Sequence, residues 1–177
     1  MAVMIETNAP EETWALGRLL GEHASPGDVL CLDGDLGAGK TVFAKGFACG
    51  LGIEEPVVSP TFTILQVYGS GRMPFYHFDA YRIEDPEEMT EVGFEEYLYG
   101  EGASLVEWSS QVPELIPGDA VRIGIRRVAG RPDSCRQITL DGLPEGMEAR
   151  VRAFVSGLPE EPAEAVQEPV SGLPEEP

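Results

Sequence analysis

The chain has 177 residues, of which 31 are acidic and 12 basic, so its formal net charge is −19. This length fits one domain with a core of its own and a tail, and it leaves no room for a second catalytic domain. A negative field of this size repels phosphate backbones. The charge therefore argues against unaided binding of nucleic acid and favours a basic partner surface.

The three cysteines are odd in number, widely spaced and free of any C-x-x-C pattern. This usage argues against a disulfide framework or a zinc site. The first residues lack a basic stretch followed by an apolar one, and no apolar run is long enough to cross a membrane. We therefore expect a cytoplasmic protein that makes no membrane contact.

The first element expected in the chain is a helix that begins within residues 8–12. Thr7 or Asn8 is the expected cap, Pro10 lies in the first turn, and two acids follow at the positive end of the helix. An apolar stripe of Trp14, Leu16, Leu19 and Leu20 predicts that this helix packs beside the domain built around the glycine-rich loop described next.

A glycine-rich loop of the form G-x-x-x-x-G-K-[ST] occupies residues 34–41. The apolar run at residues 29–32 predicts a buried strand before it, and apolar residues at helical spacing predict a helix after it. Glycines in such a loop let successive backbone N–H groups face one phosphate. The sequence therefore predicts a binding site for a nucleoside triphosphate with Mg²⁺.

Lys40 is expected to reach the β- and γ-phosphates, and the Thr41 hydroxyl to ligate Mg²⁺. The chain contains no [NT]-K-x-D segment to recognise guanine, so ATP is the expected nucleotide. The nucleotide-binding residues that we expect in and after this loop are Asp35, Leu36, Gly37, Ala38, Gly39, Lys40, Thr41 and Val42.

Two strands are predicted at residues 64–68 and 75–78, joined by a turn, and a short acidic helix and a strand at residues 103–106 follow. Asp79 and Glu107 come directly after apolar strands, where an enzyme with a phosphate-binding loop needs acids for Mg²⁺ or water. His77 is expected to be packed within its strand, and His23 to have no chemical role.

The hydroxyl-rich segment at residues 59–63 fits a loop that responds to the γ-phosphate, in which Ser59, Thr61 and Thr63 would take part. It also fits an ordinary proline turn before a strand. Trp108 fits either a core aromatic residue or a ring that contacts a ligand or partner.

Residues 121–125 and 135–140 alternate as two strands of a hairpin. The whole pattern predicts a three-layer α/β fold of the P-loop nucleoside triphosphate hydrolase type, with a mixed sheet and a C-terminal antiparallel hairpin. Five arginines on this hairpin form either a solvated face or a patch for RNA, phosphate or an acidic partner: Arg122, Arg126, Arg127, Arg131 and Arg136.

The composition changes after about residue 155. The segment VSGLPEEP at residues 155–162 recurs at residues 170–177, and residues 156–177 contain six glutamates and no base. This composition predicts a disordered acidic tail after a domain at residues 1–155. The repeat is interpreted as a spacer or a duplication, with a binding motif as the alternative.

Four segments resemble, in order and spacing, the TsaE (YjeE-type) family of bacterial ATPases. They are the loop at 34–41, residues 59–63, residues 76–82 and the pair Glu107-Trp108. The family usually continues with Pro-Glu after Glu-Trp, whereas Ser109-Ser110 stand here.

The resemblance implies the ATPase subunit of the machinery that adds threonylcarbamoyl to adenosine 37 of tRNAs reading codons that begin with A. TsaB and TsaD would be its partners, and tRNA would be bound through the complex. Catalysis would involve Lys40, Asp79 and Glu107; Mg²⁺ would be held by Thr41, Glu107 and Asp79; and Trp108 would lie near the nucleotide or the partner.

Two other functions are compatible with the residues. The first is a free-standing small-molecule kinase, in which the arginine hairpin would close over the phosphates. The second is a nucleotide sensor that does not hydrolyse its ligand. A Glu107→Gln variant distinguishes the sensor from the ATPase, since the substitution would be silent in the sensor.

Overall fold

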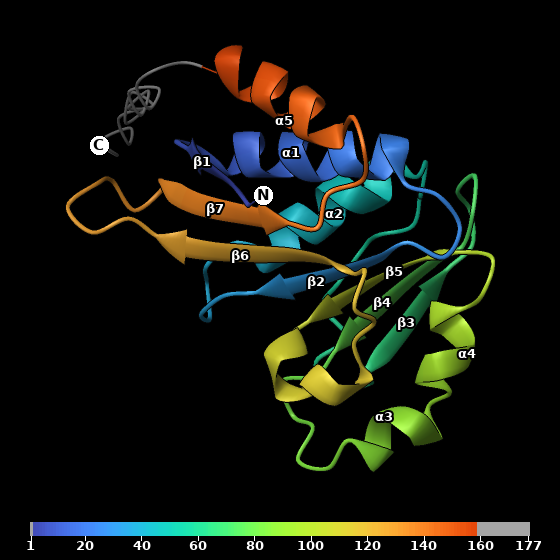
Figure 1. Ribbon diagram of the computed structural model, residues 1–177. Helices are drawn as coiled ribbons and strands as arrows, with labels where there is room; N and C mark the ends of the chain where they lie inside the picture. Colours follow the sequence, from blue (N-terminus) through green and yellow to red (C-terminus); the bar gives the residue numbers. More distant parts are fainter. Residues whose placement is uncertain (1, 159–177) are drawn as a thin grey trace, which may run out of the picture.

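The computed structural model describes residues 2–158 and has a mixed sheet of seven strands at its centre (Figure 1). The strands lie in the order β1-β7-β6-β2-β5-β4-β3. Strand β2 is parallel to β5 and β6, and β4 is parallel to β5, whereas β1–β7, β6–β7 and β3–β4 pair antiparallel. The strands are β1 (Val3–Thr7), β2 (Val29–Asp33), β3 (Leu65–Tyr68), β4 (Phe75–Asp79), β5 (Ala103–Glu107), β6 (Val121–Arg127) and β7 (Arg136–Asp141).

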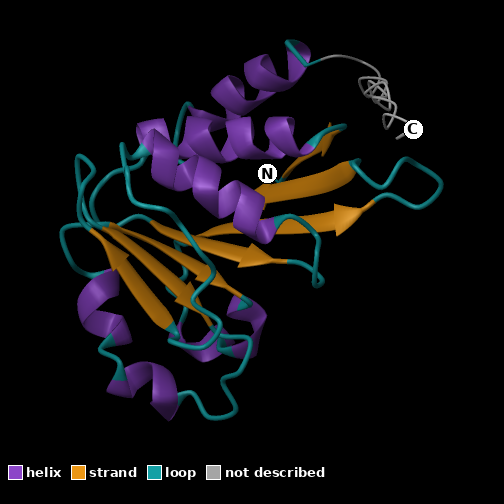
Figure 2. Ribbon diagram, turned by 180° about the vertical axis from the view of Figure 1, so that it is seen from behind, coloured by secondary structure: helices purple, strands orange, loops and turns teal. Residues whose placement is uncertain are grey.

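Helices cover both faces of the sheet (Figures 1 and 2). One face carries α1 (Pro10–His23), α2 (Lys40–Gly50) and α5 (Met147–Ser156), and the other carries α3 (Glu87–Glu91), α4 (Phe94–Leu98) and the short 3₁₀ helices η1 (Ser109–Gln111) and η2 (Pro113–Leu115). Each face has its own apolar core cluster. The three-layer α/β fold with a mixed sheet and a C-terminal hairpin is confirmed.

Successive side chains of β2 point alternately into the two apolar clusters. Leu30 and Leu32 belong to the cluster beneath α1 and α2, whereas Val29 and Cys31 belong to the cluster beneath α3 and α4. A strand that is buried on both faces reads as a continuous apolar run. This is why residues 29–32 could be recognised as a central strand.

Helices α1 and α2 pack with their backbones in close contact. A Cβ atom added at Gly46 of α2 would lie 2.0 Å from the Trp14 carbonyl oxygen of α1. A Cβ added at Gly17 would lie 2.3 Å from the Phe43 carbonyl oxygen, so small residues are needed on both helices. Helix α2 is therefore fixed against α1. The prediction that the first helix packs beside the domain of the glycine-rich loop is confirmed, whereas its contact with α2 through glycines was not predicted.

The expected cap of the first helix was wrong. Helix α1 is capped by Ala9, without a side-chain hydrogen bond, and Pro10 is its first residue. The side chain of Thr7 instead bonds to that of Thr13, and the backbone N–H of Asn8 donates to Glu12 Oε2 at 2.6 Å. Pairing of residues 3–7 with β7 carries Thr7 into the sheet, which moves the start of the helix past both expected caps.

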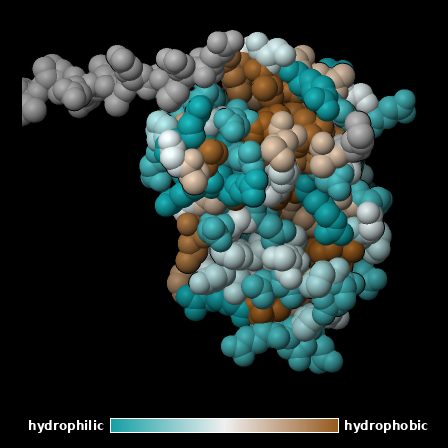
Figure 3. All heavy atoms as spheres, turned by 60° about the vertical axis from the view of Figure 1, so that its left-hand side comes forward, coloured by the Kyte–Doolittle hydropathy of each residue, from teal (hydrophilic) through white to brown (hydrophobic). Residues whose placement is uncertain are grey.

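Hydrophilic side chains cover most of the middle and lower part of the face drawn in Figure 3, and hydrophobic ones gather near its upper end, at the level of α1 and α5. Within residues 2–158, no helix is long and apolar enough to span a membrane. The repeated acidic segment lies mainly in residues 159–177, outside the described residues, so the expected division at residue 155 stays a prediction.

Candidate functional site

The glycine-rich loop joins the end of β2 to the start of α2. Gly37 and Gly39 have φ angles of 75° and 111°, a region that side chains with a Cβ rarely adopt. Gly39 caps α2, whose first residue is Lys40. The N-terminus of α2, where the first backbone N–H groups of a helix carry a partial positive charge, therefore faces the cavity that the loop lines.

Lys40 is almost fully buried beside the loop. Its Nζ atom donates to the carbonyl oxygens of Gly34 at 2.5 Å and Asp35 at 2.9 Å, and it lies 4.2 Å from the centre of the Trp108 ring. Burial lowers the pKa of Lys40 below its ordinary value, although the nearby carboxylates of Glu107 and Asp79 oppose that shift. The ammonium group thus rests on two carbonyls that a bound anion would replace.

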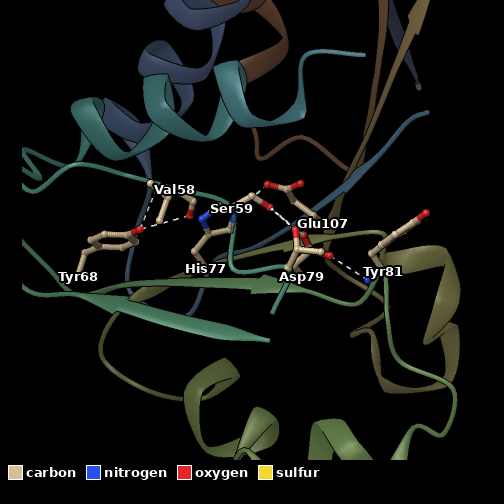
Figure 4. Close-up of polar contacts among 8 residues, drawn as sticks. Val58, Ser59, Tyr68, His77, Asp79, Tyr81 and Glu107 are labelled. Atoms are coloured by element: carbon tan, nitrogen blue, oxygen red, sulfur yellow. Dashed lines mark hydrogen bonds and ion pairs between the residues drawn. The ribbon is translucent and has the colours of Figure 1, made fainter. Parts of the chain in front are cut away.

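Asp79 and Glu107 lie side by side at the carboxyl ends of β4 and β5, where they are register partners (Figure 4). Each is only 2% exposed. The Oδ2 atom of Asp79 accepts hydrogen bonds from Ser59 Oγ at 2.8 Å and Thr61 Oγ1 at 2.9 Å, and its Oδ1 atom accepts from the Tyr81 N–H. Asp79 therefore links the hydroxyl-rich segment to the end of the sheet.

His77 is packed within β4, as predicted, and it also contacts a candidate site residue. It is fully buried, stacks on Phe75, and its Nε2 atom lies 2.8 Å from Glu107 Oε1. Because a carboxylate only accepts, Nε2 carries the proton of this bond. The contact fixes the orientation of Glu107. It could not be predicted from the sequence, because residues 77 and 107 meet only through the pairing of β4 with β5.

Trp108 follows Glu107 and turns its ring over the loop. Its backbone has φ 57° and ψ 38°, and its indole packs against Tyr81 with ring centres 4.8 Å apart. The two serines after it both bind Asp33, the residue immediately before the loop. The departure from the family pattern at Ser109-Ser110 therefore has a structural role.

A cavity of about 400 Å³ lies between these elements. Most of the predicted residues line it, and Tyr81, which the sequence did not indicate, joins them. The lining consists of Leu36, Gly37, Gly39, Lys40, Thr41, Val42, Ser59, Thr61, Asp79, Tyr81, Glu107 and Trp108.

Three of the expected site residues lie outside this lining. Asp35 contributes its carbonyl oxygen to Lys40, and Ala38 is buried with its carbonyl oxygen bonded to Arg136. Thr63 is exposed, and its N–H donates to the Pro60 carbonyl. Of the three hydroxyls expected to form a switch, only those of Ser59 and Thr61 face the cavity.

The donors around the cavity fit Mg²⁺. A hydroxyl from Thr41 and carboxylates from Asp79 and Glu107 are the hard oxygen ligands that this ion prefers. Among residues 2–158, no group of three or more His, Cys, Asp or Glu side chains is arranged to hold a metal alone. Donors from Thr41, Asp79 and Glu107 would leave coordination positions for phosphate oxygens and water, which is how Mg²⁺ is commonly bound.

Two arginines of the hairpin reach the loop: Arg136 bonds to its backbone, and Arg127 Nη2 would lie 3.1 Å from a Cβ atom added at Gly37. Arg136 donates from Nε to the Ala38 carbonyl oxygen at 2.6 Å and from Nη2 to that of Gly37 at 3.3 Å. The other four hairpin arginines are exposed, and Arg127 pairs with Asp133 at 3.6 Å. His23 is also exposed, and its Nδ1 atom bonds to a backbone carbonyl of α1.

Comparison with known proteins agrees with this geometry. A family model described as "Threonylcarbamoyl adenosine biosynthesis protein TsaE" matches residues 7–137. The chain is 51% identical over 130 residues to the tRNA threonylcarbamoyladenosine biosynthesis protein TsaE of Bacillus subtilis (strain 168), across 73% of this chain and 79% of that protein. The protein of the same name from Treponema pallidum (strain Nichols) is 40% identical over 134 residues, across 76% and 96% of the two chains.

The crystal structure of Bacillus subtilis YdiB is similar over 87% of this chain and 94% of that one, with a TM-score of 0.71 and 40% identity. The matched residues include the glycine-rich loop, the ends of β4 and β5 and most of the hairpin. The likeness thus extends over the whole frame of the cavity, and the chain belongs to the TsaE family of P-loop nucleotide-binding proteins.

Proposed function

We propose that this protein binds ATP with Mg²⁺ in the cavity and hydrolyses it while it takes part in tRNA threonylcarbamoyladenosine biosynthesis. One observation carries the proposal: the phosphate-binding loop and two buried acids from neighbouring strands line the same cavity. The names of the relatives supply the pathway.

The loop would bind the β- and γ-phosphates through its backbone N–H groups. Lys40 would exchange the carbonyl oxygens of Gly34 and Asp35 for phosphate oxygens, to which a buried ammonium group binds more strongly than in water. Thr41, one residue into α2, is placed to hold the metal, and Trp108 would cover Lys40 from the other side.

Hydrolysis would be an in-line attack of water on the γ-phosphate. Glu107, oriented by His77, and Asp79, oriented by Ser59 and Thr61, would hold the metal and direct the attacking water. When bound, Mg²⁺ would neutralise charge on the phosphate oxygens. Because these carboxylates are fixed before the ligand arrives, little reorganisation is needed during the reaction.

TsaB- and TsaD-type proteins are the proposed partners, and tRNA would be held by that complex rather than by this acidic chain. The net charge of −19 favours this arrangement, since direct contact with the tRNA backbone would be repulsive. We expect slow turnover by the isolated chain, because a partner would complete the site.

The test is ATP turnover by the purified chain, alone and with TsaB, TsaD and tRNA, with Lys40→Ala as the blank. Partner-stimulated turnover that Lys40→Ala abolishes supports the proposal. Glu107→Gln should keep most ATP binding and lose at least tenfold in turnover, since one oriented acid typically contributes about 10²–10⁴-fold.

Two results would point elsewhere. If ATP binds but no condition produces turnover, the protein is a sensor. If phosphate passes rapidly to a small acceptor without partners, it is a kinase. The structure disfavours a kinase in which Arg136 acts as a mobile lid, because Arg136 is already bonded to the loop backbone.

A further inference from the structure

Asp33 receives three hydrogen bonds from the two residues that begin η1. Ser109 Oγ donates to Oδ2 at 2.5 Å, and Ser110 donates to Oδ1 from its backbone N–H at 3.1 Å and from its Oγ at 2.9 Å. Asp33 is the last residue of β2 and stands immediately before the glycine-rich loop. These bonds join the start of the loop to the segment that follows β5.

Trp108 lies inside this junction. Its backbone N–H donates to the Leu32 carbonyl oxygen at 3.0 Å, and the next residue, Ser109, bonds to Asp33. The last two residues of β2 therefore hold the backbone at the tryptophan and directly after it. The φ angle of 57° places Trp108 in the left-handed region, which is unusual for a bulky residue. Such a conformation persists only where the surrounding contacts impose it.

The imposed backbone directs the indole ring to a defined place. The ring lies 4.2 Å from Lys40 Nζ and 4.8 Å from the ring of Tyr81, at the wall of the cavity. A released Trp108 could return to negative φ, which would swing the ring away from Lys40 and admit water there. Water raises the local dielectric and weakens the attraction between an ammonium group and an anion.

We propose that Asp33, Ser109 and Ser110 form a clamp of positioning residues that holds Trp108 over Lys40 and keeps water from that end of the nucleotide cavity. The consequence for ATP rests on the proposed function, whereas the placement of the ring does not. Because Asp33 adjoins the loop, the clamp also makes the indole move with the loop as one unit.

The experiment uses the full chain with Trp14→Phe, so that Trp108 is the sole tryptophan. The test variant adds Ser109→Ala and Ser110→Ala, which remove the two hydroxyl donors. Ser110→Thr keeps the hydroxyl at an exposed position, and Ser156→Ala removes a hydroxyl from α5, far from the cavity. These two variants are the matched controls.

The first measurement is acrylamide quenching of Trp108 without nucleotide. We expect the quenching constant of the double variant to rise at least twofold, with a red-shifted emission maximum, while both controls match the parent. The second is the Kd for ATP with Mg²⁺, which should rise about tenfold in the double variant only, on the scale of a lost contact between a desolvated cation and a ring.

Unchanged quenching and emission in a folded double variant would overturn the proposal. If the double variant does not fold, Ser110→Ala replaces it, since that side chain is exposed and the backbone bond to Asp33 remains. Its quenching constant should then exceed that of Ser110→Thr, and equal constants would overturn the role of the Ser110 hydroxyl in the clamp. A parent that binds no ATP would refute the proposed function, and the quenching result would still decide on the clamp.

Discussion

A single added methyl group at Gly46 tests whether α1 and α2 are fixed against each other as the structure shows. The Cβ of a Gly46→Ala variant would lie 2.0 Å from the Trp14 carbonyl oxygen, whereas ordinary contacts of this kind are 3.4–4 Å. The obstacle is backbone, which cannot rotate away. The two helices would have to separate by about 1 Å, and the packing between them would be lost.

The expected size follows from two opposing terms. Alanine in a helix is favoured over glycine by about 1 kcal/mol, and overpacking of a rigid contact costs about 1–3 kcal/mol and occasionally more. Because the contact is with rigid backbone, we take the upper end of this overpacking cost, about 3 kcal/mol. Subtracting the helix-propensity gain of about 1 kcal/mol leaves an expected net loss of about 2 kcal/mol. In a domain of this size, that corresponds to a fall in Tm of about 4–8 °C.

Urea and thermal unfolding of Gly46→Ala, followed by circular dichroism, measure this loss. Gly118→Ala is the matched control, because a Cβ at Gly118 has no neighbour within 4 Å. We expect the control to stay within about 0.5 kcal/mol of the parent. A Gly46→Ala protein as stable as the parent, or more stable, would refute the helix contact, since helix propensity alone favours alanine.

Three further predictions concern the loop and its neighbours. Thr61→Val removes one donor to Asp79 and should speed amide exchange in residues 59–63 about tenfold, as measured by hydrogen exchange with mass spectrometry. Arg136→Gln removes the side-chain bonds to the loop carbonyls and should weaken ATP binding about tenfold in calorimetry, with a Tm close to that of the parent. The lowered pKa of Lys40 means that the folded protein holds this proton less tightly than the unfolded chain. The free energy of unfolding should therefore rise, relative to that of Lys40→Met, as the pH increases from the lowered pKa of Lys40 towards its ordinary value of 10.5. Urea titrations of both proteins at several pH values measure this difference.

Local patterns predicted the parts of the site that each lie within one short segment. The apolar run before Gly34 and the helical spacing after Thr41 placed the loop between β2 and α2. Asp79 and Glu107 could be paired in advance because carboxyl ends of parallel strands meet at one edge of a sheet. The hairpin at residues 121–140 was visible from its alternation.

Features that depend on distant pairing were missed. Residues 3–7 form β1, with Val3 and Ile5 buried, because they pair with β7 more than 100 residues away. This pairing also explains the error at the cap of α1. The alternation of apolar and polar residues at 3–7 indicates a strand, but five residues are too few to distinguish a strand from an irregular N-terminal segment.

Glycines in the sequence of both helices also indicate the close packing of α1 on α2. Gly17 and Gly21 recur at a spacing of four residues in the first helix, and Gly46 and Gly50 do so in the second. This spacing puts each pair on one helix face, where small residues let two backbones approach. No local rule says which helix such a face will meet, so the contact needed the structure.

The site is held by backbone contacts behind the glycine-rich loop and by side-chain hydrogen bonds in front of it, and the topology of the sheet explains this difference. Strand β2 lies between β5 and β6, both parallel to it, so the loop, the acids and the hairpin meet at one edge of the sheet. Helix α2 is held from behind by backbone contact with α1, which keeps Lys40 and Thr41 in place. The contacts in front of the loop are side-chain hydrogen bonds, from Ser59 and Thr61 to Asp79, that a bound ligand could exchange. Any response to nucleotide should therefore occur in residues 59–63, while α2 and Trp108 stay fixed.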